Sequence, residues 1–124
     1  MATVLVVDDV AMFRNVVMHA LKGAGHEALS APDGEAALQM LNAARVDLVL
    51  LDLAMPKMNG LEFLQRLRAD RRFDSLPVVV VSALTPSPQG GSGLPAGAQA
   101  QLLKSRFSLR DLIRCVNDLL KVAA

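Results

Sequence analysis

Uninterrupted apolar runs are the feature that most limits how this chain of 124 residues can fold. Four consecutive valines occupy Val78–Val81, and similar runs occupy Thr3–Val7 and Val46–Leu51. A strand with one face in water alternates apolar and polar residues, whereas an uninterrupted apolar strand is buried on both faces. Because helical segments separate these runs, the sequence predicts an α/β fold, with a parallel sheet covered by helices on both faces.

Amphipathic helices are predicted between the strands, because apolar residues recur there at steps of three and four. The apolar stripes are Phe13, Val16, Val17, Ala20 and Leu21, then Ala37, Leu38 and Leu41, then Leu61, Leu64 and Leu67, and finally Leu109, Leu112, Ile113, Val116, Leu119 and Leu120. Asp33 and Ser108 are predicted helix caps, Ser108 in a capping box with Asp111. Further strands are expected at Glu27–Ala31 and Gln101–Leu103, which makes five in all.

Composition indicates one domain over residues 1–124, since 52% hydrophobic residues suffice for one core. The net charge of +1 and the absence of Trp and Tyr give no basis for direct nucleic-acid binding. The only cysteine, Cys115, cannot form an internal disulfide, and the apolar run before Asp8 is too short for a signal peptide or a membrane span. We therefore expect a cytoplasmic protein without membrane insertion or an attached effector domain.

Polar side chains stand at the carboxyl ends of the predicted strands. They are Asp8 and Asp9 after the first, Asp52 after the third, Ser82 after the fourth and Lys104 after the fifth. Right-handed crossovers bring these ends to one edge of the sheet, where ligands of such folds bind. Clustered carboxylates repel one another unless a cation binds, and oxygen ligands favour Mg²⁺. A carboxylate beside Mg²⁺ and a lysine can act as a nucleophile toward phosphorus.

Four motifs occur in an order and at spacings that resemble the receiver domain of two-component response regulators. They are Asp8-Asp9, LLDLAMPKMNG with Asp52, Ser82-Ala83 and Lys104, and the resemblance covers essentially the whole chain. It implies a flavodoxin-like (CheY-like) fold with strand order 2-1-3-4-5. It also implies a stand-alone phosphoprotein that signals through protein–protein contacts.

The resemblance assigns a role to each residue of this edge. Asp52 would accept a phosphoryl group from a histidine kinase or a histidine phosphotransfer protein. Ser82 would hydrogen-bond the phosphoryl oxygens, and Lys104 would pair with Asp52 or its phosphoryl group. Mg²⁺ would be held by Asp9, Asp52 and the backbone carbonyl of Ala54, with Asp8 acting through bound water. A downstream target protein would then recognise the phosphorylated domain, which turns over no external substrate.

Two other functions remain open from the sequence. A phosphohydrolase with an aspartyl-phosphate intermediate ordinarily has a second Asp two residues after its nucleophile, where this chain has Ala54. An interaction module would instead bind an anionic ligand, such as a nucleotide second messenger, through arginines, because their forked guanidinium groups bind phosphates. The candidate arginines are Arg66, Arg68, Arg71, Arg72, Arg106, Arg110 and Arg114.

The segment Thr85–Gly97, with the sequence TPSPQGGSGLPAG, departs from the receiver pattern where a helix ordinarily lies. Each interior proline costs a helix about 3 kcal/mol and each glycine about 1 kcal/mol, so no stable helix is expected there. We therefore expect a missing or disordered fourth helix, and an order–disorder equilibrium over residues 85–96 that phosphorylation shifts.

Four single positions also depart from the receiver pattern. Gln101 stands in place of an aromatic switch residue, and Ser105 in place of the proline after the lysine. Ala54 and Leu84 cannot orient an attacking water, which predicts slow self-dephosphorylation.

Overall fold

The structure of the chain, a computed structural model, describes residues 2–52, 60–82, 98, 100–103 and 108–123. Its elements are β1 (Thr3–Val7), α1 (Ala11–Gly23), β2 (Glu27–Ala31), α2 (Gly34–Ala43), β3 (Leu48–Asp52), α3 (Gly60–Arg68), the 3-10 helix η1 (Arg71–Phe73), β4 (Val78–Ser82), β5 (Ala100–Leu103) and α4 (Leu109–Ala123). The strands form one sheet in the order β2-β1-β3-β4-β5, and all adjacent pairs are parallel. The predicted α/β class with a parallel sheet is confirmed.

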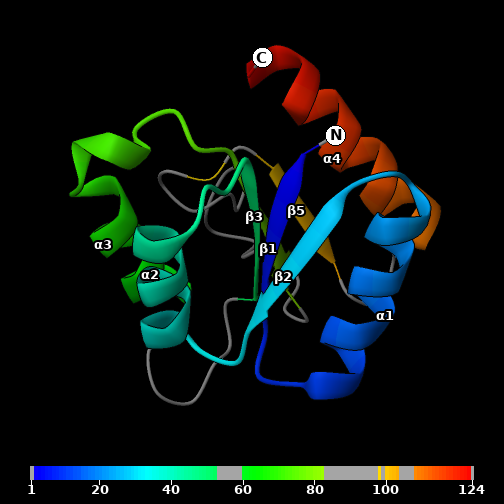
Figure 1. Ribbon diagram of the computed structural model, residues 1–124, viewed down its shortest axis with the longest axis horizontal. Coiled ribbons are helices and arrows are strands. Elements are labelled where there is room, and N and C mark those ends of the chain that lie inside the picture. Colours follow the sequence, from blue (N-terminus) through cyan, green and yellow to red (C-terminus); the bar gives the residue numbers. More distant parts are fainter. Residues whose placement is uncertain (1, 53–59, 83–97, 99, 104–107, 124) are drawn as a thin grey trace, which may run out of the picture.

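Helices cover both faces of the sheet, with α1 and α4 on one side and α2 and α3 on the other (Figure 1). Alternate residues of the same strands therefore enter two separate cores. One core contains Leu5, Val7, Val49, Leu51, Val78 and Val80 from the strands, with Ala37, Leu41, Phe63, Leu64 and Leu67 from α2 and α3. The other contains Val4, Val6, Leu48, Leu50 and Val79, with Val17, Leu21, Leu112 and Val116 from α1 and α4. This arrangement is why no polar residue interrupts these strands.

The predicted caps of two helices are present. Asp33 accepts a hydrogen bond from the Ala36 N–H at 2.8 Å and so caps α2. At α4 the Ser108 hydroxyl accepts from the Asp111 N–H, and the Asp111 carboxylate accepts from the Ser108 N–H, both at 3.2 Å. This reciprocal pair satisfies two backbone donors that the first turn of a helix leaves without partners.

The predicted start of the third strand is wrong. The third strand begins at Leu48 and includes Asp52, whereas a start at Val46 was expected. The Asp47 carboxylate instead accepts a hydrogen bond from the Thr3 N–H at 2.9 Å, which holds it at the entrance to the strand. No side chain caps the first helix, whose N-cap residue is Val10.

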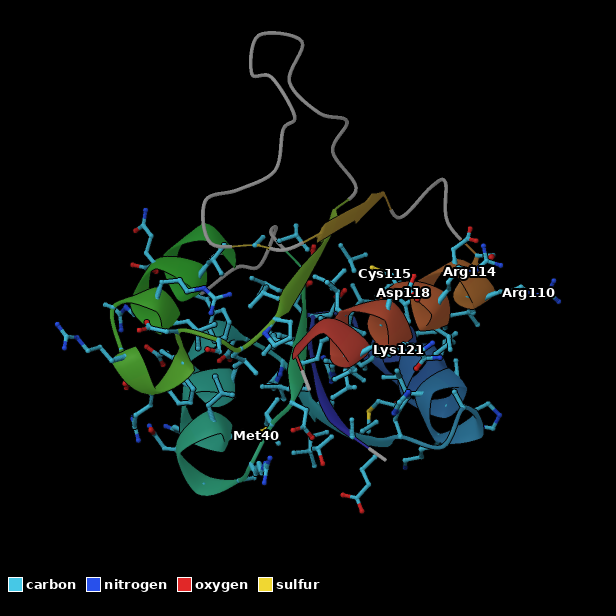
Figure 2. All side chains as sticks on the ribbon, turned by 90° about the horizontal axis from the view of Figure 1, so that it is seen from above. Met40, Arg110, Arg114, Cys115, Asp118 and Lys121 are labelled. Carbon is cyan, nitrogen blue, oxygen red and sulfur yellow. The ribbon has the colours of Figure 1, made fainter. Side chains whose placement is uncertain are left out.

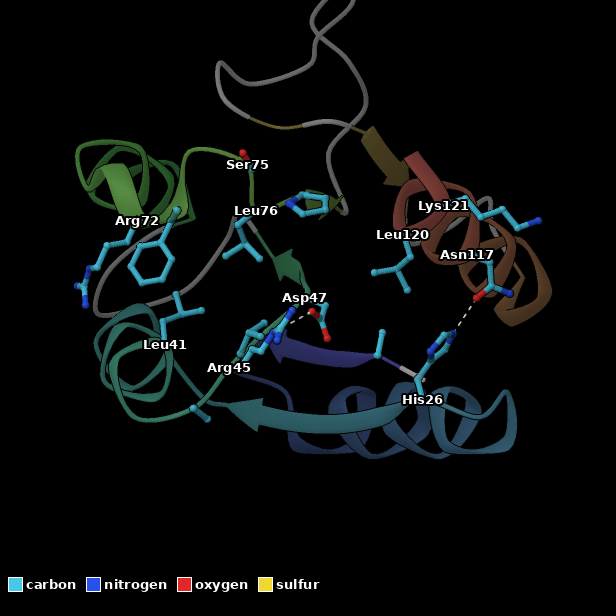
Figure 3. Close-up of a pocket in the computed structure, with 15 residues that line it drawn as sticks. His26, Leu41, Arg45, Asp47, Arg72, Ser75, Leu76, Asn117, Leu120 and Lys121 are labelled. Atoms are coloured by element: carbon cyan, nitrogen blue, oxygen red, sulfur yellow. Dashed lines mark hydrogen bonds and ion pairs between the residues drawn. The ribbon is translucent and has the colours of Figure 1, made fainter. Parts of the chain in front are cut away.

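A cavity of about 840 Å³ lies at the amino-terminal edge of the sheet, opposite the strand ends that carry the acidic residues (Figure 3). Its polar side chains contact one another. Arg45 approaches Asp47 at 3.7 Å, and His26 Nε2 lies 2.7 Å from Asn117 Oδ1. The second contact ties α4 to the turn before β2, so His26 has a structural role.

Several expectations concern positions outside the described residues. These are the missing helix and the order–disorder equilibrium over residues 85–96, and the slow self-dephosphorylation predicted from Ala54 and Leu84. Within the described ranges, no helix combines the length and the apolar character that crossing a bilayer requires.

Candidate functional site

Three carboxylates meet at the carboxyl-terminal edge of the sheet. One oxygen from each of Asp8, Asp9 and Asp52 lies within 4.8 Å of the others. Asp8 and Asp52 are only 1% and 4% exposed, whereas Asp9 is exposed. The cluster therefore has two buried carboxyl groups and a third that reaches solvent.

Strand pairing brings these residues together although 43 positions separate Asp9 from Asp52. β1 and β3 are neighbours, and their register pairs Val7 with Leu51. The residues that follow this pair, Asp8 and Asp52, therefore lie at the same level of the sheet. Asp9 comes one position later, in the turn that leads to α1.

Hydrogen bonds on Asp8 to described residues fix the turn between β1 and α1. Its backbone N–H donates to the Ala31 carbonyl at 3.2 Å, and its carboxylate Oδ1 accepts from the Val10 N–H at 2.9 Å. The Arg14 guanidinium donates from Nη1 to the Asp8 carbonyl oxygen at 2.6 Å. Arg14 was not among the residues predicted from sequence. The sequence feature that could have pointed to Arg14 is a positively charged side chain in the first turn of the helix that follows the aspartate pair.

The donor set of the cluster fits Mg²⁺. It offers carboxylate oxygens from separate elements, and Mg²⁺ binds through one or two carboxylates while it keeps several waters. The exposed Asp9 side leaves the cluster open to solvent, as a hydrated ion requires. Mutual repulsion of three close carboxylates gives a further reason for a cation to bind there.

Other predicted site residues lie at the same edge or outside the described part. Ser82 is the last residue of β4, and Val81 before it pairs with Asp52. Ser82 itself pairs with Leu103, the last residue of β5 and the one that precedes Lys104. Lys104 and Ala54 are outside the described residues, so their predicted roles stay predictions.

Three of the arginines that could form an anion site contact other residues of the protein. Arg68 donates to the carbonyl oxygens of Phe73 and Leu76 at 2.6 and 2.7 Å, and so holds the connection from α3 to β4. Arg72 binds Asp70 at 2.7 Å and Asn42 at 2.8 Å, while Arg66 approaches Glu62 at 4.0 Å. Arg110 and Arg114 are exposed on α4 (Figure 2). Anionic-ligand binding through these arginines stays a prediction, and the contacts of the described ones do not favour it.

The parallel sheet with a carboxylate cluster at its carboxyl edge defines a CheY-like α/β domain. Comparison of the sequence with protein families gives a match to the response regulator receiver domain over residues 4–117. The chain therefore belongs to this family, the receiver domains of two-component systems. Receiver domains of this family are signalling modules.

Relatives and solved structures agree with this assignment. The DNA-binding response regulator MtrA of Mycobacterium tuberculosis is 36% identical over 118 residues, which are 95% of this chain and 50% of MtrA. The chain spans 15% of the gliding motility regulatory protein of Myxococcus xanthus and 52% of the phosphate regulon transcriptional regulatory protein PhoB of Pseudomonas aeruginosa. The chemotaxis protein CheY4 of Vibrio cholerae has a TM-score of 0.86 and 34% identity, covering 96% of this chain and 98% of CheY4.

A further solved structure contains ligands. The response regulator TrrA of Thermotoga maritima, in complex with Mg²⁺ and BeF, has a TM-score of 0.82 and 28% identity. The match covers 96% of this chain and 99% of TrrA.

Proposed function

We propose that this chain is a Mg²⁺-dependent phosphoacceptor, phosphorylated on Asp52. The observation that carries the proposal is the convergence of Asp8, Asp9 and Asp52 within 4.8 Å at the edge where ligands of such sheets bind. Asp52 ends a buried central strand, so its carboxylate has a fixed position from which to attack.

The chemistry is an in-line displacement at phosphorus. A carboxylate oxygen of Asp52 forms a bond to the phosphorus of the donor, while the bond from phosphorus to the donor's leaving atom breaks. The electron pair of the broken bond leaves with the donor, which is the imidazole of a phosphohistidine or the acetate of acetyl phosphate. Mg²⁺ held by Asp9, Asp52 and the Ala54 carbonyl, with Asp8 acting through water, would supply positive charge against the phosphoryl oxygens.

Ser82 and Lys104 are proposed to complete the site. The strand register supports this, because β4 ends beside β3, and β5 ends beside β4, at the edge that carries Asp52. A hydroxyl at residue 82 would hydrogen-bond a phosphoryl oxygen, and an ammonium at residue 104 would offset its charge. The phosphodonor would be a histidine kinase or a histidine phosphotransfer protein, and the output a contact with a target protein.

Phosphorylation by a small donor tests the proposal without knowledge of the kinase. The native protein is incubated with acetyl phosphate and Mg²⁺, and the intact mass is measured. We expect one added phosphoryl group in the native protein, none in Asp52→Asn, and none when EDTA replaces Mg²⁺. The matched control is Asp47→Asn, which removes a carboxylate just before the same strand but at the opposite edge, and it should still be phosphorylated. Equal labelling of Asp52→Asn and the native protein would contradict the proposal.

A further inference from the structure

The turn that carries the aspartate pair is short. Only residues 8–10 separate the end of β1 from the start of α1, so the path of this turn decides where the Asp9 carboxylate points. Helix α1 begins at this turn, and its N-cap residue, Val10, provides no side-chain capping hydrogen bond. No hydrogen bond or ion pair to another described residue orients the Asp9 carboxylate itself. Its direction therefore depends on how firmly the backbone at Asp8 and Asp9 is held.

Arg14 holds this backbone from the first turn of α1. Its Nη1 donates to the Asp8 carbonyl oxygen at 2.6 Å, a short charge-assisted hydrogen bond at a half-buried position. The carbonyl belongs to the peptide bond between Asp8 and Asp9, so the guanidinium fixes the plane from which Asp9 extends. The hydrogen bond from the Val10 N–H, by contrast, uses the Asp8 carboxylate, which is itself part of the cluster. The Arg14 bond uses a backbone oxygen and no oxygen of the three carboxylates.

We propose that Arg14 is a positioning residue that orients Asp8 and Asp9 for Mg²⁺. The inference rests on the proposed function, because it concerns the same carboxylate site. Residues that hold metal ligands in place from outside the coordination sphere contribute about 10–100-fold to metal affinity. Arg14 acts on a backbone carbonyl next to the ligands, so the lower end of this range, about 10-fold, is expected.

Replacing Arg14 has two opposite effects on Mg²⁺ affinity, one from the loss of its charge and one from the loss of its hydrogen bond. A positive charge near the cluster repels Mg²⁺, so if charge alone mattered, its removal would tighten Mg²⁺ binding. If positioning dominates, removal lets the turn move and weakens binding. Positioning should dominate because the hydrogen bond is direct, whereas a partly exposed charge is screened by water and salt.

Titration calorimetry with MgCl₂ measures the difference on native protein, Arg14→Met, Arg14→Lys and the control Lys22→Met. Lys22 lies in the last turn of α1, so Lys22→Met removes the same charge from the same helix far from the cluster. We expect Arg14→Met to weaken Mg²⁺ binding about 10-fold, Arg14→Lys to recover part of that loss, and Lys22→Met to equal the native protein. Tighter or unchanged binding in Arg14→Met, with native-like circular dichroism, would overturn the inference.

Phosphorylation by acetyl phosphate provides a second readout. Arg14→Met should need about 10-fold more Mg²⁺ for half-maximal rate, while its rate at saturating Mg²⁺ stays near the native value. A merely structural defect would instead lower the saturated rate. If Arg14→Met does not fold, Arg14→Lys decides, since native affinity in that variant would refute a role for the planar guanidinium. Failure of the native protein to bind Mg²⁺ would refute the proposed function instead.

Discussion

Replacing Asp52 by asparagine should make the metal-free protein more stable. Asp8 and Asp52 are buried, and their carboxylate oxygens lie within 4.8 Å of each other. At that distance two unit charges repel by about 3.5 kcal/mol with the effective dielectric constant of about 20 that suits protein sites. Asp9 is exposed, so its repulsion of Asp52 adds only about 0.5 kcal/mol after screening by water and salt.

One contribution opposes this gain. Asp52 takes part in a further interaction within the chain, which a neutral amide retains only in part. A loss of about 1–2 kcal/mol is expected from that change. Relief of repulsion therefore prevails, and Asp52→Asn should raise the free energy of unfolding by about 2 kcal/mol, with a rise in Tm of about 6–10 °C.

Urea unfolding followed by circular dichroism measures this free energy, since the protein has no Trp for fluorescence. In EDTA we expect Asp52→Asn to be more stable than the native protein, and Asp47→Asn to be no more stable. Mg²⁺ at ten times its Kd should stabilise the native protein by about 1.4 kcal/mol and Asp52→Asn by much less. If Asp52→Asn in EDTA were equally or less stable than the native protein, repulsion within the cluster would not be a significant term.

Two further predictions concern α4. Ser108→Ala removes the hydroxyl that accepts from the Asp111 N–H, and should lower the free energy of unfolding, measured by urea unfolding, by about 1 kcal/mol. Ser108→Asp can still cap the helix and should lose little stability. Equal losses in both variants would exclude a capping role. Burial raises the pKa of the Cys115 thiol, and the nearby Asp118 charge raises it further. Less thiolate is therefore present at any given pH below this pKa, so iodoacetamide at pH 8 should alkylate Cys115 more slowly in the folded protein than in urea. Equal rates in the two states would contradict this effect of burial.

The sequence by itself determined the layered architecture and the chemical class of the site. Runs such as Val78–Val81 can be accommodated only where both faces of a strand are covered, and the two cores on either side of the sheet show this burial. The caps at Asp33 and Ser108 were equally predictable, because a cap depends on residues only three positions apart. The acidic residues at strand ends likewise indicated a cation site once a parallel sheet was expected.

Tertiary structure alone decided the geometry of that site. The separation of the carboxylates and the burial of Asp8 and Asp52 follow from the register of β1 against β3. The contact from Arg14 to the Asp8 carbonyl depends on the angle at which α1 leaves the sheet, and that angle is set by packing. Sequence periodicity reports local backbone preferences over a few residues, whereas these distances arise from contacts between segments far apart in the chain.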